Sequence, residues 1–382
     1  MDIVGIDAGT NECVKARLGQ SIEGVERVAT PAGKVPFLAP GWIDIQVNGY
    51  AGVDYNSPVT AHEQIARSLE MQFAAGVTRL YPTVITGEPE RMLGAVRNLG
   101  RARENLVAGR AIEGLHIEGP HISREDGPRG AHPRESVREP DIDEYRRWQD
   151  ASGGLVKLVT LSPEWPGAVR YIEALATDGV VAAIGHTNAS SAQIEEAVRA
   201  GATMSTHLGN GSHTTIPRHS NYIFDQLAED RLMASFIADG IHLPPAFLKV
   251  ALRAKGVERS VLITDAVMPA GCAPGVYRLG AMEVELHPGD RVTLADTNQL
   301  AGSALRIDRG VANLVRIAGL SLSNAVAMAT RNAARAGRIE GRQQGLTRGE
   351  RGDLVVFDWD EETAAIEVRR TYLDGELIYE KS

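Results

Sequence analysis

Residues 179–210 of the chain read GVVAAIGHTNASSAQIEEAVRAGATMSTHLGN, and this stretch decides the fold class. Its apolar run Val180–Ile184 has the length and the β-branched content of a buried strand. Ser190, three residues before Gln193, gives the capping-box pattern that starts an amphipathic helix, and a glycine marks the end of that helix. A second short strand is expected at 203–206. A strand, a helix and a second strand in this order predict a parallel βαβ unit.

The same alternation continues on both sides of this stretch. A second capping-box pattern, Thr60 with Glu63, predicts the start of the helix after the first strand. The expected strands are Trp42–Val47, Val77–Val84, Ala111–Ile117, Leu155–Leu161, Val180–Ile184, Thr203–Thr206, Ala234–Ile237 and Val261–Thr264. Eight such strands in about 230 residues fit a closed (β/α)8 barrel better than an open sheet. Helices expected at 304–320 and 321–336 complete this barrel.

The two ends of the chain have a different pattern, in which short strands are separated by turn residues. These strands are expected at 2–6, 12–19, 24–29, 353–359, 364–373 and 376–380. Three further strands follow the eighth barrel strand and predict a hairpin excursion, at 276–280, 282–287 and 291–295. Both ends of the chain are therefore expected to be rich in β-structure.

Composition limits the class of protein. The 382 residues are 43% hydrophobic and 23% charged, which is typical of a globular chain and excludes disordered, collagen-like and disulfide-framework proteins. Asp and Glu number 49 against 40 Lys and Arg, so we expect neither nucleic acid nor an anionic membrane as the main partner. Cys13 and Cys272 lie far apart and are expected to be reduced thiols. An acidic N-terminus, without an apolar run of about 20 residues, predicts a cytoplasmic location.

Polar side chains stand where the predicted strands end. They are Glu118 after the third strand, His186 after the fifth, His207 after the sixth, His242 after the seventh and Asp265 after the eighth. In a barrel of this kind the C-terminal ends of the strands form the active site. One or two such residues could be accidental, but five converging on one face of a barrel are difficult to explain by structure alone.

Imidazole nitrogen and carboxylate oxygen are the ligand set of a catalytic Zn²⁺ or a similar divalent ion. We assign Glu118, His186 and His207 as three protein ligands that leave one position open for water. Such an ion lowers the pKa of its water towards about 7. Asp265, one strand further round, is then placed to take a proton from the water and pass it to a leaving group.

Several motifs around these residues resemble a known family. They are PGWIDIQVNGYAGVDY (40–55), HIEGP (116–120), GAHP (130–133), GHTNA (185–189), THLGN (206–210), ADGIH (238–242) and TDA (264–266). Their order and spacing resemble the N-acetylglucosamine-6-phosphate deacetylase family of the amidohydrolase superfamily, from about residue 36 to the segment GERGDLVVFD at 349–358.

The resemblance implies an α/β fold, a (β/α)8 TIM-like barrel with a small β-sandwich domain formed by the N- and C-terminal segments. The implied boundaries are 1–38 with 337–382 for the β-sandwich and 39–336 for the barrel. The implied activity is metal-dependent hydrolysis of the acetamide of N-acetylglucosamine 6-phosphate to glucosamine 6-phosphate and acetate. Such an enzyme belongs to amino sugar metabolism, and homodimers are common in the family.

The resemblance also implies a role for each residue that matches its motifs. The metal ligands match Glu118, His186 and His207, and the catalytic acid/base matches Asp265. The substrate contacts match His132, which polarises the amide carbonyl, His242 at the sugar or acyl group, Asn210 and the backbone of Gly211 in a phosphate-side loop, and Arg218 at the phosphate.

Some points stay open at this stage. Many superfamily members begin the first strand with His-x-His, but this chain has Gln46 and Asn48, which favours one metal ion over two. Gln46 and Asn48 are expected either to hydrogen-bond the metal-bound water or the substrate, or only to satisfy backbone groups. Zn²⁺ is expected, with Fe²⁺ or another divalent ion as the alternative.

The loop 208–221 departs from the family pattern, so Arg218 is either a phosphate clamp or an ordinary loop arginine. The alternative substrates are an unphosphorylated N-acetylhexosamine or another amide. A non-catalytic sugar-phosphate-binding protein is the remaining alternative.

Overall fold

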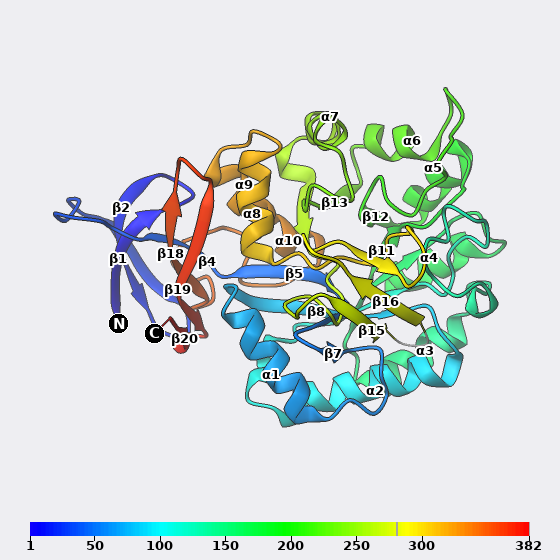
Figure 1. The fold of residues 1–382 in the computed structure, drawn as a ribbon, viewed down its shortest axis with the longest axis horizontal. Coiled ribbons are helices and arrows are strands. Elements are labelled where there is room, and N and C mark those ends of the chain that lie inside the picture. Colours follow the sequence, from blue (N-terminus) through cyan, green and yellow to red (C-terminus); the bar gives the residue numbers. More distant parts are fainter. Residues whose placement is uncertain (280–281, 382) are drawn as a thin grey trace.

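The computed structural model describes residues 1–279 and 282–381, and a closed parallel barrel forms its centre (Figure 1). Eight strands pair side by side in chain order. They are β5 (Trp42–Val47), β8 (Val77–Ile85), β9 (Leu115–Glu118), β10 (Val156–Leu161), β11 (Val181–Ile184), β12 (Ala202–Ser205), β13 (Met233–Ile237) and β14 (Ser260–Ile263). Backbone hydrogen bonds from Asp265 N to Gln46 O (2.9 Å) and from Asn48 N to Ala266 O (2.7 Å) join the last strand to the first. The predicted fold class is therefore confirmed.

One barrel strand begins four residues later than predicted. The strand expected at Ala111–Ile117 begins at Leu115, because a 3₁₀ turn at Ala108–Ala111 takes up the residues before it. The hydrogen bond from Ile112 N to Gly109 O closes this turn. Apolarity alone does not distinguish a buried turn from a buried strand, which explains the error.

Helices cover the outside of the barrel. They are α1 (His62–Phe73), α2 (Pro89–Asn105), α3 (Ile142–Ser152), α4 (Ala168–Thr177), α5 (Ser191–Ala200), α6 (Tyr222–Ala228), α7 (Pro245–Lys255), α8 (Ile307–Arg316), α9 (Leu322–Met328) and α10 (Arg331–Ala336). The capping box of Ser190 with Gln193 is confirmed at the start of α5, and Gly201 ends that helix in the left-handed region.

Two helix predictions are wrong in detail. Thr60 does not cap α1, because its hydroxyl donates to the carbonyl of Asp54 (2.8 Å) and the helix begins after Ala61 without a side-chain cap. The single helix expected at 321–336 is divided into α9 and α10. Thr330, between them, has φ −131° and ψ −100°, and its hydroxyl donates to Val326 O. Backbone of that conformation cannot continue an α-helix.

Segments from both ends of the chain form a separate seven-stranded sheet, the terminal sheet. Its order is β20-β19-β18-β4-β1-β2-β3, and every neighbouring pair is antiparallel except β1 with β4. The strands are β1 (Asp2–Asp7), β2 (Glu12–Leu18), β3 (Ile22–Arg27), β4 (Phe37–Pro40), β18 (Leu354–Asp360), β19 (Ala365–Leu373) and β20 (Glu376–Glu380). In Figure 1 the blue and red strands of this sheet lie beside the barrel, at the left.

Two small sheets lie near the mouth of the barrel, the end at which the barrel strands finish. One pairs β6 (Gly49–Tyr50) with β7 (Val53–Asp54). The other contains β15 (Gly275–Leu279), β16 (Met282–Leu286) and β17 (Val292–Leu294), as the predicted hairpin requires. Gly280, the last residue of the strand predicted at 276–280, lies outside the described residues.

A group of buried charges, the junction cluster, joins the barrel to the terminal sheet. Arg79 of β8 donates from Nε and Nη2 to the two carboxylate oxygens of Asp353 (2.8 and 3.1 Å), and Arg342 Nε lies 3.3 Å from Asp353 Oδ2. All three side chains are buried. Burial raises the pKa of Asp353, but Arg342 and Arg79 outweigh this effect and hold it below its usual value.

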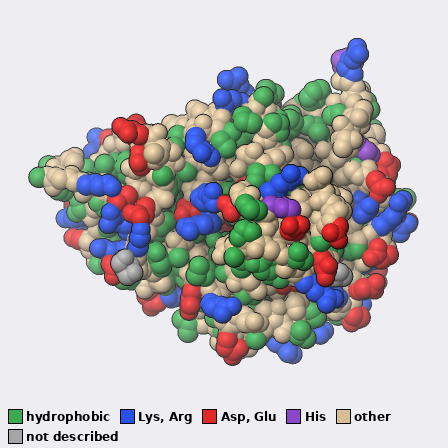
Figure 2. Space-filling view, in the orientation of Figure 1, with side chains coloured by type: hydrophobic (Ala, Val, Ile, Leu, Met, Phe, Trp, Pro, Cys, Tyr) green, Lys and Arg blue, Asp and Glu red, His purple; other side chains and the backbone are tan. Residues whose placement is uncertain are grey.

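Basic and acidic side chains are interspersed over the face shown in Figure 2. Within residues 1–279 and 282–381, no helix has the length and apolarity needed to cross a membrane.

Candidate active site

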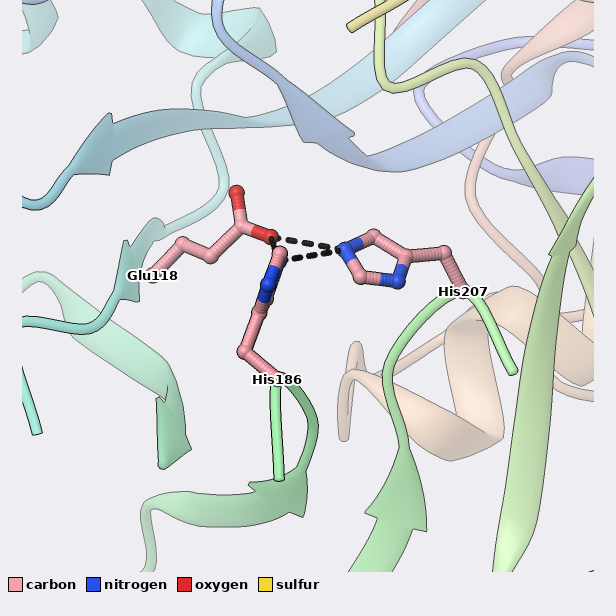
Figure 3. A group of neighbouring side chains, drawn as sticks. All are labelled: Glu118, His186 and His207. Atoms are coloured by element: carbon pink, nitrogen blue, oxygen red, sulfur yellow. Dashed lines mark hydrogen bonds and ion pairs between the residues drawn. The ribbon is translucent and has the colours of Figure 1, made fainter. Parts of the chain in front are cut away.

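Three predicted ligands converge at the mouth of the barrel (Figure 3). Glu118 ends β9, while His186 and His207 each stand two residues beyond a strand end. His207 Nε2 lies 2.8 Å from Glu118 Oε1, and His186 Nε2 lies 3.1 Å from both Glu118 Oε1 and His207 Nε2. The three side chains are buried. Three strands that are distant in sequence therefore bring three metal-ligating atoms to one point.

The backbone is strained where these side chains leave the strands. His186 has φ +49°, His207 has φ +29° and Asp265 has φ +51°. These angles lie outside the regions that residues with a Cβ prefer, and each costs roughly 1–3 kcal/mol. Backbone hydrogen bonds hold two of these turns, because Leu208 N donates to Ser235 O and Asp265 N donates to Gln46 O. Strain of this kind is typical of functional sites.

The ring of His186 is fixed by contacts on its other side. Its Nδ1 lies 2.7 Å from the carbonyl oxygen of Pro128, so Nδ1 carries the proton and Nε2 turns an unshared electron pair towards Glu118. Gly211 packs against the same ring. A Cβ at Gly211, where φ is +55°, would lie 2.5 Å from His186 Nδ1, so only glycine fits there.

The donor set fits a divalent cation. Two imidazole nitrogens and one carboxylate oxygen face a common centre. Two imidazole nitrogens that both lack a proton repel one another, so the distance of 3.1 Å between His186 Nε2 and His207 Nε2 is favourable only when a cation or a proton lies between them. Burial raises the pKa of Glu118, but the adjacent imidazoles of His186 and His207 outweigh it and keep the pKa well below its ordinary value. Glu118 is therefore ionised, as a metal ligand must be.

Asp265 lies beside this group, two residues beyond the end of β14, which is separated from β12 by one strand of the barrel. Its Oδ1 accepts hydrogen bonds from Asn48 Nδ2 (2.7 Å) and Gln46 Nε2 (3.2 Å). Burial, and then the negative charge of Glu118, raise the pKa of Asp265 to about 6. A carboxyl with that pKa can both accept and return a proton near neutral pH. Gln46 and Asn48, predicted as contacts of water or substrate, thus donate hydrogen bonds to Asp265.

Two more predicted histidines line the same cavity. The ring of His132 packs edge-on against His186, with centroids 4.5 Å apart. Burial, and then the charge of His186, lower the pKa of His132 to about 3, so His132 is neutral at physiological pH. His242 is oriented by Asp239, whose Oδ2 lies 2.6 Å from His242 Nδ1.

The cavity has a volume of about 640 Å³, and nine of the predicted site residues line it. They are Asn48, Glu118, His132, His186, His207, Asn210, Gly211, His242 and Asp265. Gln46 is buried and is not among the residues that line the cavity.

Arg218 is not brought to this cavity. It is exposed on the loop between β12 and α6, and it forms no hydrogen bond or ion pair with the residues that the structure describes. That loop projects from the molecule above α5 and α6 in Figure 1. In this arrangement of the loop, Arg218 therefore lies outside the lining of the cavity.

Two groups that orient the site, Asp239 and Asp44, were not predicted from the sequence. Asp239 stands in the motif ADGIH, but no role was assigned to it. Asp44 lies buried behind Asp265 and accepts hydrogen bonds from the backbone N and the hydroxyl of Thr264. Asp44 forms part of the motif at 40–55, so its position in that motif was the available signal.

Comparisons with known proteins agree with this geometry. The model of a family described as the amidohydrolase family matches residues 37–378. The N-acetylglucosamine-6-phosphate deacetylase of Bacillus subtilis (strain 168) is 33% identical over 338 residues, which cover 88% of this chain and 83% of that protein. The Homo sapiens protein of the same name is 34% identical over 357 residues, covering 90% and 83%.

Solved structures give the same result. The N-acetyl-D-glucosamine-6-phosphate deacetylase of Mycobacterium smegmatis superposes with a TM-score of 0.89 at 31% identity, over 99% of this chain and 100% of that chain. A mutant of that enzyme, in complex with N-acetyl-D-glucosamine-6-phosphate, gives 0.87 at 31% identity and covers 99% of each chain. This chain belongs to the amidohydrolase family and, within it, to the N-acetylglucosamine-6-phosphate deacetylases.

Proposed function

We propose that this protein hydrolyses the acetamide of N-acetylglucosamine 6-phosphate, releasing acetate and glucosamine 6-phosphate. The observation that carries the proposal is the placement of Asp265 beside the convergent ligands Glu118, His186 and His207. The relatives of this chain that carry the deacetylase name support the choice of substrate. The mutant of the Mycobacterium smegmatis enzyme that was solved with this sugar phosphate supports it further.

Glu118, His186 and His207 would hold one divalent ion, for which Zn²⁺ is the proposed identity and Fe²⁺ the alternative. Such an ion supplies Lewis-acid chemistry, since it polarises a carbonyl and lowers the pKa of water. Asn48 Nδ2 and Gln46 Nε2 fix the carboxylate of Asp265. Because its pKa of about 6 keeps Asp265 mostly ionised at pH 7, it accepts the proton of the attacking water and returns it to the departing amine nitrogen.

His132 and His242 position the substrate from the other walls of the cavity. His132 is neutral, so it offers an N–H to the amide carbonyl without competing for a proton. A donor at that place stabilises the oxygen on which negative charge develops. Asp239 holds His242 by Nδ1 and leaves its Nε2 free for the sugar or acyl group.

The loop after β12 is proposed to contact the phosphate of the substrate. Asn210 and Gly211 line the cavity and are the proposed phosphate-side contacts. Arg218 is exposed, so its proposed bond to the phosphate requires the loop 208–221 to move towards the cavity. The exposed position of Arg218 also favours one second candidate, hydrolysis of an unphosphorylated N-acetylhexosamine.

Acetate release distinguishes these candidates. The purified protein, reconstituted separately with Zn²⁺, Fe²⁺ and Mn²⁺, is assayed with N-acetylglucosamine 6-phosphate and with N-acetylglucosamine. We expect kcat/KM at least a hundredfold higher for the phosphorylated sugar. Equal values would support the unphosphorylated substrate. No release from either sugar, by protein that contains metal, would contradict the proposed function. A cytoplasmic homodimer is proposed as its setting, to be tested by fractionation and by light scattering.

A further inference from the structure

A second chamber, of about 220 Å³, lies beside the active-site cavity. Its lining includes Val84 and Ile85 at the end of β8, Gly87 in the loop that follows, Met92 of α2 and Pro133. A water molecule takes about 30 Å³ in the liquid, so the chamber has room for several carbon atoms.

The two spaces share part of their walls. Ile85, Leu279 and Met282 line both of them. Ile85 is also the register partner of Glu118 across the pairing of β8 with β9. Pro133, which lines the chamber, directly follows His132, which lines the cavity. The chamber therefore adjoins the cavity next to the groups that would surround an amide carbonyl.

The shared wall is apolar, since it consists of isoleucine, leucine and methionine side chains. Of the polar lining residues, Glu88 and Glu135 are exposed, which places them at the outer rim of the chamber. Asn56, Thr86 and Ser136 are buried and Arg91 is half-buried, but apolar atoms make up most of the exposed wall. An apolar, concave space of this kind favours an alkyl group over the polar parts of a sugar phosphate.

The order of the strands round the barrel indicates which end of the substrate would face the chamber. Asp265, which would protonate the nitrogen, follows β14, and His242 follows the neighbouring β13. The sugar attached to that nitrogen is therefore expected on this side of the mouth. The chamber lies at the end of β8, where Ile85 is in register with Glu118. An acyl carbon placed between Asp265 and His132, which both line the cavity, would present its alkyl substituent to the chamber.

We propose that the chamber takes the alkyl part of the acyl group, so that this protein also hydrolyses N-propionyl- and N-butyrylglucosamine 6-phosphate. The inference rests on the proposed function, because it extends the acyl group of the same substrate. Each methylene that moves from water into the chamber strengthens binding about fourfold.

The chemistry is unchanged for these substrates. The oxygen of water bonds to the acyl carbon, the C–N bond breaks, and the proton accepted by Asp265 moves to the amine nitrogen. The products are the straight-chain carboxylate and glucosamine 6-phosphate. Nothing is oxidised or reduced.

The first test compares kcat/KM of the wild-type enzyme for the N-acetyl, N-propionyl and N-butyryl sugars. We expect the N-butyryl value to lie within about tenfold of the N-acetyl value. An N-butyryl value more than a hundredfold lower, with normal N-acetyl hydrolysis, overturns this inference and leaves the proposed function standing. If none of the three sugars is hydrolysed, both this inference and the proposed function are contradicted.

The second test fills the chamber with the variant Gly87→Leu. A Cβ at Gly87 would lie 3.7 Å from Met92 Cγ and 3.9 Å from Ile85 O, which are ordinary contacts with two residues of the chamber wall. The variant is designed so that the rest of the leucine side chain reduces the space in the chamber. We expect kcat/KM to fall at least thirtyfold for the N-butyryl sugar and less than threefold for the N-acetyl sugar. An equal loss for both sugars contradicts the inference.

The matched control is Gly24→Leu on β3 of the terminal sheet, where a Cβ has no atom within 4 Å. It should change neither kcat/KM value, and its thermal unfolding should match that of Gly87→Leu. If Gly87→Leu does not fold, Met92→Ala decides instead. This change enlarges the chamber and should raise kcat/KM for an N-hexanoyl sugar at least fivefold, whereas no gain contradicts the inference.

Discussion

The protein buries charged groups in two places, at the mouth of the barrel and at its junction with the terminal sheet. The mouth cluster consists of Glu118, His186, His207 and Asp265, and the junction cluster consists of Arg79, Arg342 and Asp353. In the junction cluster, Arg79 contacts both oxygens of Asp353, so opposite charges compensate one another within the chain. In the mouth cluster, burial and then the negative charge of Glu118 raise the pKa of Asp265 to about 6.

This difference separates a structural charge cluster from a functional one. Both clusters carry the desolvation penalty of buried ions. At the junction, counterions from the same chain offset this penalty. At the mouth, part of it is left for a cation and a substrate to offset when they bind. Strained backbone is found at three residues of the mouth cluster, His186, His207 and Asp265, and at none of the junction cluster.

The largest expected effect tests the mouth cluster directly. Asp265→Asn should lower kcat by about 10³–10⁴-fold, because the amide cannot accept the proton of water. The bound metal should remain near the wild-type amount, since Glu118, His186 and His207 are intact. Steady-state kinetics and elemental analysis check both statements. A variant without metal would show that Asp265 is a ligand and not a base.

The junction cluster should respond in stability alone. Asp353→Asn leaves Arg79 and Arg342 buried without their main counterion, so we expect the free energy of unfolding to fall by about 3–5 kcal/mol. At a temperature where the variant is folded, its kcat should stay within twofold of wild type. Denaturant unfolding and kinetics measure these two quantities. A large loss of kcat in folded protein would refute the separation of the two clusters.

Removal of the metal tests whether the mouth cluster binds a cation independently of the junction cluster. A cation present at 100 to 1,000 times its Kd stabilises the folded protein by about 3–4 kcal/mol. Chelation should therefore lower the Tm of wild type and of Asp353→Asn alike. Glu118→Gln, which lacks one ligand, should show little or no change on chelation. Differential scanning calorimetry gives the answer, and an equal shift in all three proteins would argue against Glu118 as a ligand.

The pH dependence of stability should distinguish wild type from Asp353→Asn. Because the pKa of Asp353 in the folded protein lies below its ordinary value of 3.8, its contribution is complete above about pH 4. It is lost as pH falls through the lower, folded pKa. The difference in unfolding free energy between the two proteins should therefore be constant near neutrality and shrink in acid. A difference that grows in acid would reverse the assigned sign.

The smallest expected effect concerns the loop outside the mouth cluster. If the loop 208–221 moves Arg218 to the phosphate, Arg218→Ala should raise KM about tenfold for the phosphorylated sugar. It should leave the values for N-acetylglucosamine unchanged, because that sugar offers no phosphate to the guanidinium. No change with either sugar would show that Arg218 is an ordinary surface residue.

The barrel could be predicted because its strands are apolar runs between helices with clear ends, as at Val180–Ile184 and Gly201. The residues at the mouth could be predicted because strand ends in a barrel converge. The contact of Arg79 with Asp353 could not, since the two residues lie 274 positions apart and no periodic pattern connects them. The outward position of Arg218 depends on a long loop that lacks such a pattern.

The pairing of β4 with β18 has a consequence for the protein as it is synthesised. β4 leaves the ribosome more than 300 residues before its partner, so the terminal sheet cannot be completed until nearly the whole chain has emerged. Until then Arg79 cannot form its ion pair with Asp353. The nascent barrel therefore holds a guanidinium whose acidic partner is Glu113 alone, at 3.5 Å. A chain truncated before residue 353 is expected to be a substrate for chaperones and proteases rather than a smaller working enzyme.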